Sequence, residues 1–254
     1  MILTLSADGT RLDDVTVRPR VQLMSATGDR IGGPVEAVPV RPPGIEAVSY
    51  VATLPIPAPG AWRLEVVAPL ISGARVGSAA LDALDPGTTA ALGAPAPGIR
   101  TPTLADVGGV ARAVTTDPAP DLRLSQTSTA DALAAGQPFA LIVDSTRFKV
   151  SPACGRAIIM ARYLLDRWRE VAFIHLEPYA YSVVADTAVL KGTLQDPILT
   201  EPAAAWGVGG DPWGPRSMPW VFVVDGSGTV RAKYQGVMGT DDVDVILALI
   251  AQGG

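Results

Sequence analysis

The spacing of hydrophobic residues changes partway along the chain, and this change limits the possible folds more than any other feature of the sequence. From residue 3 to about 67, short segments such as "VTVRPRVQLM" and "AWRLEVVA" alternate apolar with polar residues between Gly and Pro breaks. From about residue 121 onward, continuous apolar runs such as "FALIV" and "WVFVV" alternate with helical patterns such as "CGRAIIMARYLLDRW". Alternation indicates antiparallel strands, and buried runs between helices indicate an α/β sheet. We therefore predict an N-terminal all-β sandwich followed by a C-terminal α/β domain.

The two predicted domains are joined by a segment of different composition. Residues 72–120 are rich in Ala, Gly, Pro and Thr, as in "LDPGTTAALGAPAPGIRTPTLADVGG". Few large apolar side chains are present to offset the entropy of ordering, so this composition predicts an extended linker. The expected domains are a β-sandwich at 1–71 and an α/β domain at 121–254, and we expect the second to fold without the first.

Charge and the counts of Cys and His argue against several classes of function. The formal net charge is -5, which argues against nucleic acid because phosphate binding requires clustered Lys and Arg. The single Cys and single His leave too few ligands for a zinc or copper site, and no lysine-bearing phosphate loop is present. We expect no metal, no cofactor and no membrane span in this sequence. The sequence leaves the oligomeric state open.

The order of elements predicted after residue 121 is helix, strand, helix, strand, helix, β-hairpin and helix. The segment "SMPWVFVVDGSGTVRAKYQG" places a proline immediately before the first strand of the hairpin. In this order and in this segment, the chain from about residue 121 to its end resembles the thioredoxin family. The resemblance implies a thioredoxin-like fold in which the Met218-Pro219 bond is cis and faces the active site. The insertion "GGDPWGPRS" before this proline is longer than thioredoxins usually have.

The active-site motif of thioredoxins, C-x-x-C at the start of a helix, is incomplete because Cys154 is the only cysteine. If Cys154 is the second cysteine of the motif, the first has become Ser151, and the short link from the strand residue Asp144 favours this alignment. If Cys154 is the first cysteine, the second has become Ala157. A wider spacing, as in some envelope relatives, places Lys149 at the first position. Each of these alignments loses one thiol.

A single thiol changes what such a site can do. Thiol-disulfide exchange needs a second thiol to resolve the mixed disulfide, so a lone cysteine cannot complete an intramolecular cycle. The resemblance then implies a degenerate redox site in a non-catalytic binding or accessory module, with Asp144 as the buried strand carboxylate. It also implies a peptide groove beside Pro219. Met218, Trp220 and the inserted Trp213 are the expected contacts for a protein or peptide partner.

The alternative function is a monothiol redox enzyme or sensor that uses Cys154. The helix N-terminus and the neighbouring Lys149 and Arg156 favour a thiolate, whereas burial opposes it. Peroxiredoxins share this fold, and "SPAC" resembles the end of their P-x-x-x-T/S-x-x-C motif, but Arg147 stands where that motif has proline. Their activating arginine is also replaced, by Pro219, so a peroxidase is the least favoured interpretation.

Two further residues and the first third of the chain carry less specific signals. His175 and Glu177 lie in "VAFIHLEPY", where we expect a buried sheet histidine and a strand-end carboxylate. The run "YVATLPIPAPGAWRLEVVA" resembles the end of immunoglobulin-like domains of bacterial envelope proteins, which implies a spacer domain and a protein that is extracytoplasmic or membrane-anchored. The first residues, "MILTLSADGT", lack the features of a secretory signal, so a cytoplasmic protein and a removed leader both stay open.

Overall fold

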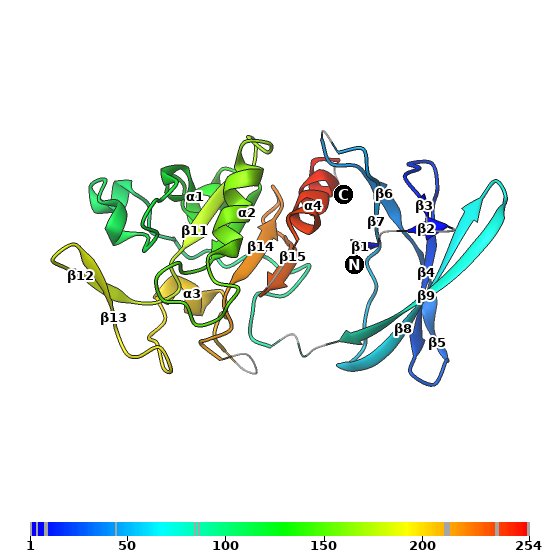
Figure 1. Ribbon diagram of the computed structural model, residues 1–254, viewed down its shortest axis with the longest axis horizontal. Coiled ribbons are helices and arrows are strands. Elements are labelled where there is room, and N and C mark those ends of the chain that lie inside the picture. The colour runs from blue at the N-terminus through cyan, green and yellow to red at the C-terminus, as the bar shows by residue number, and fades with distance from the viewer. Residues whose placement is uncertain are drawn as a thin grey trace. The chain divides into compact units, whose positions relative to one another are not determined.

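The computed structural model describes residues 2–3, 5–7, 10–43, 45–83, 85, 87–210, 214–236 and 239–252. The chain divides into two compact units. Unit 1 comprises Met1–Asp85 with Leu247–Gly254, and unit 2 comprises Pro86–Ile246. Figure 1 labels their elements, and strands outnumber helices among the described residues.

Unit 1 is built from antiparallel strands in two main sheets. The larger sheet has the strand order β5-β4-β8-β9, with the bounds Arg30–Glu36, Arg20–Ser25, Gly60–Leu70 and Gly73–Ala83. The smaller has the order β1-β7-β6, with the bounds Ile2–Leu3, Ser49–Val51 and Val38–Val40, and a separate ribbon pairs β2, Ser6–Ala7, with β3, Thr10–Arg11. Buried side chains of both sheets, among them Leu23, Tyr50 and Leu64, share one core. This arrangement is consistent with the predicted β-sandwich.

Strand β9 lies inside the segment that composition predicts to be a linker. It pairs with β8 along its whole length, from Gly73 opposite Leu70 to Ala83 opposite Gly60. Nearly all of its side chains are exposed. The strand is therefore ordered by its backbone hydrogen bonds to β8 and not by the burial of apolar side chains. The predicted limit at residue 71 therefore falls within a β-hairpin, and the linker prediction is wrong for its first part.

The main sheet of unit 2 has the strand order β11-β10-β14-β15. The bounds of these strands are Ala172–Leu176, Phe139–Val143, Trp220–Val224 and Val230–Gln235. Strands β10 and β11 are parallel, whereas β14 is antiparallel to both β10 and β15. Every residue of β10, β11 and β14 is buried, which explains why each reads as an unbroken apolar run.

Short helices accompany this sheet. The α-helices are α1 at Thr129–Ala134, α2 at Arg156–Leu165, α3 at Glu201–Ala205 and α4 at Thr240–Ala251. Helix α2 follows β10 in the chain and packs against β10 and β11 (Figure 1). The Trp168 indole after α2 donates to Asp244 of α4 at 2.6 Å, which ties the two helices together. None of the described helices has the length and apolar content needed to cross a membrane.

Residues 87–125 belong to unit 2, although most of them were predicted to be linker. They contain the 3-10 helices η1, η2 and η3, at Ala105–Val107, Ala111–Ala113 and Leu122–Ser125. Backbone hydrogen bonds join Gly93 and Ala94 to Val230, at 2.8 and 3.0 Å, along the outer edge of β15. A Cβ atom on Gly207 would lie 1.9 Å from the carbonyl oxygen of Thr88, so only glycine permits this approach. Backbone contacts and small residues thus order a segment with few large side chains.

A hairpin that the sequence analysis did not predict follows β11. It pairs β12, Tyr181–Val184, with β13, Thr187–Leu190. Its turn residues Ala185 and Asp186 have positive φ angles of 45° and 62°, without the Gly or Asn that usually marks such a turn.

Candidate functional site

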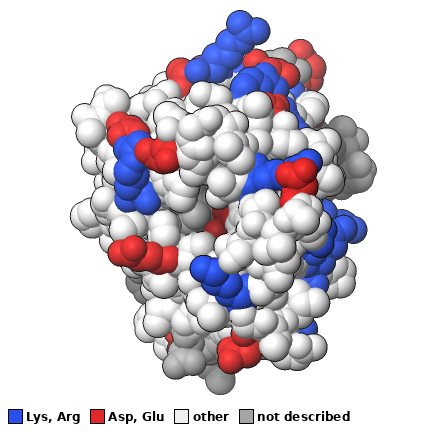
Figure 2. Space-filling view, turned by 90° about the vertical axis from the view of Figure 1, so that its left-hand side faces the viewer, with Lys and Arg blue, Asp and Glu red and all other residues white. Residues whose placement is uncertain are grey.

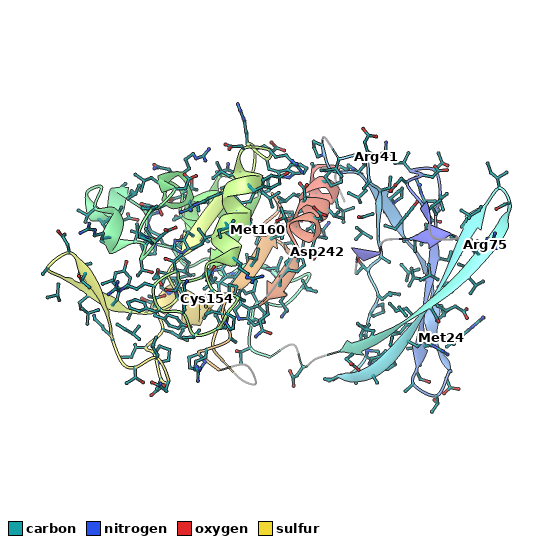
Figure 3. All side chains as sticks on the ribbon, in the orientation of Figure 1. Met24, Arg41, Arg75, Cys154, Met160 and Asp242 are labelled. Atoms are coloured by element: carbon teal, nitrogen blue, oxygen red, sulfur yellow. The ribbon has the colours of Figure 1, made fainter. Side chains whose placement is uncertain are left out.

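Cys154 lies in the turn that leads into α2, where the sequence predicts the active site. Its side chain, labelled in Figure 3, is only 6 % exposed. It belongs to the core of unit 2 together with Phe148, Tyr179, Met218 and Trp220. A thiol packed in this way is shielded from reagents in solution and acts as a small apolar side chain.

Ser151 is the polar neighbour of this thiol. Its Oγ atom lies 3.6 Å from Sγ of Cys154 and donates a hydrogen bond of 2.8 Å to the carbonyl oxygen of Met218. The same Oγ atom accepts from the backbone N–H of Ala153 at 3.2 Å. The structure therefore brings Ser151 and Cys154 together, and it fixes the hydroxyl of Ser151 by bonds within the protein.

Asp144 follows β10 and is fully buried beneath the start of α2. Its carboxylate accepts from the backbone N–H of Gly155 at 3.0 and 2.9 Å and from that of Ser145 at 2.8 Å. Burial raises the pKa of Asp144 to about 6, while these N–H donors act in the opposite direction. Gly155 can present its N–H in this way because it adopts a left-handed conformation, with φ of 87°. The Asp144 carboxylate thus accepts the hydrogen bond of a backbone N–H at the N-terminus of α2. That N–H could otherwise stabilise a thiolate.

The residues expected to form a peptide groove beside Pro219 are buried where the structure describes them. The Met218-Pro219 bond is cis, as predicted. However, Met218, Pro219 and Trp220 are all buried, and the carbonyl oxygen of Pro219 accepts from the N–H of Gly236 at 2.8 Å. The side chains of Met218 and Trp220 are therefore buried rather than exposed at the surface. The third expected contact, Trp213, lies outside the described residues.

The remaining sequence candidates stand apart from the thiol. Lys149 and Arg156 are exposed, and within the described part of the chain no hydrogen bond or ion pair joins either of them to Cys154. Ala157 is buried on α2. The sequence prediction that these two cations stabilise a thiolate therefore has no contact to support it.

A second buried acid, Glu177, lies at the end of β11 and proves more notable than the sequence indicated. It is 4 % exposed, and its Oε2 atom accepts from the backbone N–H of Thr116 at 3.0 Å and from its hydroxyl at 2.7 Å. Its other oxygen, Oε1, is buried without a hydrogen-bond partner among the described residues. Burial raises the pKa of Glu177 to about 7, and the neighbouring Asp144 adds to this rise. Only the position of Glu177 before a proline at a strand end signalled it in the sequence.

His175 is the buried sheet histidine that the sequence predicted. Its Nε2 atom lies 2.9 Å from the carbonyl oxygen of Asp144, and burial lowers the pKa of the imidazole. Tyr179, which sequence reasoning missed, is fully buried and donates its hydroxyl to the carbonyl oxygen of Pro215 at 3.0 Å. Burial also raises the pKa of Tyr179. Each ring is thus fixed by a hydrogen bond to a backbone carbonyl.

No group of three or more His, Cys, Asp or Glu side chains that could hold a metal ion occurs in the described ranges. The site is therefore one buried thiol, one adjacent hydroxyl and two buried carboxyl groups, arranged around the start of α2. Comparison with protein-family models found no matching family, and comparisons with curated proteins and with solved structures found no match either.

Proposed function

We propose that unit 2 carries a thioredoxin-like domain with a degenerate single-cysteine site, and that the chain acts as a non-catalytic binding or accessory module of the cell envelope. The strand order β11-β10-β14-β15, with a parallel β10-β11 pair joined through α2, supports the thioredoxin-like part of this proposal. The cis bond at Met218-Pro219 before β14 and helix α4 after the hairpin fit the same family order. The immunoglobulin-like character of unit 1 and the location in the envelope rest on sequence resemblance.

The non-catalytic assignment rests on one observation, which is that Cys154, the only cysteine of the sequence, is buried in the core beside Ser151. Thiol exchange requires in-line access to the sulfur and a second thiol to complete the cycle. Cys154 is 6 % exposed and its nearest polar neighbour is Ser151, whose hydroxyl cannot replace the second thiol. The monothiol alternative requires Cys154 to meet a partner at the surface, and this packing disfavours it.

The test is reduction of insulin by dithiothreitol in the presence of the purified protein. We expect a rate equal to the uncatalysed background, because no second thiol can release a mixed disulfide. Thioredoxin in the same assay provides the positive control. Multiple turnovers above background would reject the proposal.

A gain of function sharpens this test. In Ser151→Cys the new sulfur would start from the position of an oxygen that already lies 3.6 Å from Sγ of Cys154. We expect mild oxidation to form an intramolecular disulfide, measured as a loss of two mass units and of two free thiols. The matched control is Ser182→Cys on the exposed strand β12, which should retain both thiols. If Ser151→Cys does not form a disulfide, the alignment of Ser151 with the lost thiol is wrong.

A further inference from the structure

Unit 2 contains a cavity of about 410 Å³ that the proposed function does not use. It is lined by residues of the 111–120 segment, by Arg147 after β10, and by residues 186–188 at the tip of the β12-β13 hairpin. Figure 2 shows the face of unit 2 at the end that carries the β12-β13 hairpin, where Lys and Arg are interspersed with Asp and Glu on the surface. Its volume falls within the range of small-molecule sites, at about 300 to 1,000 Å³. We call it the Arg147 cavity.

The position of the Arg147 cavity in the fold favours ligand binding. Arg147 lies four residues after Val143, the last residue of β10, and the β12-β13 hairpin begins soon after Leu176, the last residue of β11. The carboxyl ends of these parallel strands therefore both lead into segments that line the cavity. In open α/β sheets this edge is where ligands bind, because loops that follow the strands converge there.

The charges that line the cavity leave one arginine uncompensated. Arg112 pairs with Asp186, with 2.6 Å between Nη1 and Oδ1. Asp117 pairs with Arg162 of α2. Arg147 forms no ion pair with any carboxylate of the described residues, and its Nε atom donates to the carbonyl oxygen of Ala188 at 2.9 Å. That bond fixes the plane of the guanidinium and leaves its two terminal nitrogens for another acceptor.

A second potential donor belongs to another residue that lines the cavity. Thr115 is buried, and its Oγ1 atom accepts from the backbone N–H of Asp117 at 3.1 Å. The proton of this hydroxyl has no acceptor in the described part of the chain. The hydroxyl of Thr116, by contrast, donates a hydrogen bond to the carboxylate of Glu177. The apolar wall is short and consists of Ala111, Pro118, Pro120 and Ala188.

We propose that the Arg147 cavity binds a small organic monocarboxylate, whose carboxylate is held by the guanidinium of Arg147 and the hydroxyl of Thr115. A planar fork of two N–H donors matches a carboxylate better than a spherical anion. One uncompensated positive charge matches one negative charge, so the cavity favours a monoanion over a dianion such as phosphate. The apolar wall accommodates a body of a few carbon atoms.

The second large cavity of unit 2 provides a contrast and a control. It measures about 370 Å³ and includes Arg169, but it is lined by Gln137, Val171 and Ala172, at the amino ends of β10 and β11. No described hydrogen bond fixes the guanidinium of Arg169. An exposed arginine thus lies beside a cavity at the amino ends and at the carboxyl ends of β10 and β11. Of these two arginines, only Arg147 is oriented by a hydrogen bond to a backbone carbonyl.

The experiment is titration of the full chain with butyrate and with benzoate, followed by backbone amide NMR shifts at constant ionic strength, with chloride and phosphate as comparison anions. We expect saturable shifts at Thr115 and Thr116 with a dissociation constant of about 1 mM or tighter. Arg147→Gln should weaken binding at least about tenfold, because a hydrogen-bonded charge is lost. Arg169→Gln should leave the affinity unchanged. Unchanged amide spectra away from the substituted residue verify the fold of each variant.

Three results would overturn this assignment. Neither carboxylate gives a saturable shift, or Arg147→Gln and Arg169→Gln weaken binding equally, or phosphate binds as tightly as butyrate. A redox-active protein with this cavity would still bind the carboxylate, so the outcome is independent of the insulin assay.

Discussion

The surroundings of Cys154 and the Arg147 cavity lie close together in the sequence but differ in where their polar groups bond. Around Cys154, the hydroxyl of Ser151 and the carboxylate of Asp144 bond to backbone groups of the protein. In the Arg147 cavity, the two terminal nitrogens of a guanidinium and the proton of a buried hydroxyl have no acceptor among the described residues. The two regions therefore differ in the hydrogen-bonding capacity that they leave open, and the proposed carboxylate site rests on that difference.

Replacing Asp144 by Ala should have the largest effect on this comparison. The change removes the acceptor of the buried N–H of Ser145 and of the partly buried N–H of Gly155, so we expect a loss of about 3 kcal/mol in the free energy of unfolding. Urea denaturation measures it. Alkylation of Cys154 in the folded state should also become faster in this variant, because an amide at the start of α2 is released. A change below about 1 kcal/mol would mean that the start of α2 does not depend on Asp144.

The buried acids predict how stability depends on pH. The pKa of Glu177 rises from 4.5 to about 7, and that of Asp144 from 3.8 to about 6, because burial disfavours their charged forms. The folded state therefore holds these protons more tightly than the unfolded chain. Their stabilisation is complete at acid pH, below the unfolded values, and is lost as pH rises through about 6 and then about 7. Burial lowers the pKa of His175 below its ordinary value of 6.5, so its effect on stability has the opposite sign. It destabilises the folded state at acid pH, and this destabilisation is lost as pH rises.

We expect the free energy of unfolding to fall by about 1 kcal/mol between pH 6 and pH 8, because the two acids lower it by about 2 kcal/mol and His175 offsets part of that fall. Urea denaturation at each pH measures the change. Glu177→Gln removes one titrating group and should flatten this dependence, with a variant more stable than the parent at pH 8. A stability that rises over this range in both proteins would show that Glu177 ionises normally.

Thr116→Val tests the contact between the 111–120 segment and β11. It removes the 2.7 Å hydrogen bond from the Thr116 hydroxyl to Glu177 but retains the shape of the side chain. We expect a loss of about 1 kcal/mol at pH 8, where Glu177 is charged, and a smaller loss at pH 5. The matched control is Thr187→Val on β13, which should have no effect at either pH. Equal losses in the two variants would mean that the effect does not come from the hydrogen bond to Glu177.

The smallest effect on stability is expected for Arg147→Gln. Arg147 is exposed and contributes one side-chain hydrogen bond to Ala188, so the midpoint of urea denaturation should change by the equivalent of about 0.5 kcal/mol or less. A larger loss would give Arg147 a structural role like that of Asp144, and the contrast between the two regions would disappear.

The sequence predicted best those elements that are defined by the burial of large apolar side chains. Strands β10, β11 and β14 and helix α2 were identified because their apolar periodicity is unambiguous. Strand β9 and the 87–120 segment were missed because small residues and backbone hydrogen bonds order them, which composition does not reveal. The β12-β13 hairpin was missed because Ala185 and Asp186 form its turn without a glycine.

The same distinction applies to the site. The proximity of Ser151 and Cys154 follows from their spacing along one turn, so the sequence could indicate it. The burial of Met218 and Trp220 could not be predicted, because whether a side chain beside a strand faces solvent depends on what packs over it. The Arg147 cavity was missed because its lining comes from three segments that are distant in sequence, and no local motif joins them.

The segment that pairs with the start of β15 also bears on what an isolated fragment of unit 2 would expose. An uncovered edge strand presents free N–H and C=O groups on which a strand of another molecule can add. Residues 93–96 occupy that position on Val230 and on Gly228. A fragment that starts at residue 121, the limit suggested by composition, would lack this cover and would also lack Leu104 and Val114, which are buried. We expect such a fragment to oligomerise through β15, so an isolated unit 2 should be expressed with residues 86–120 included.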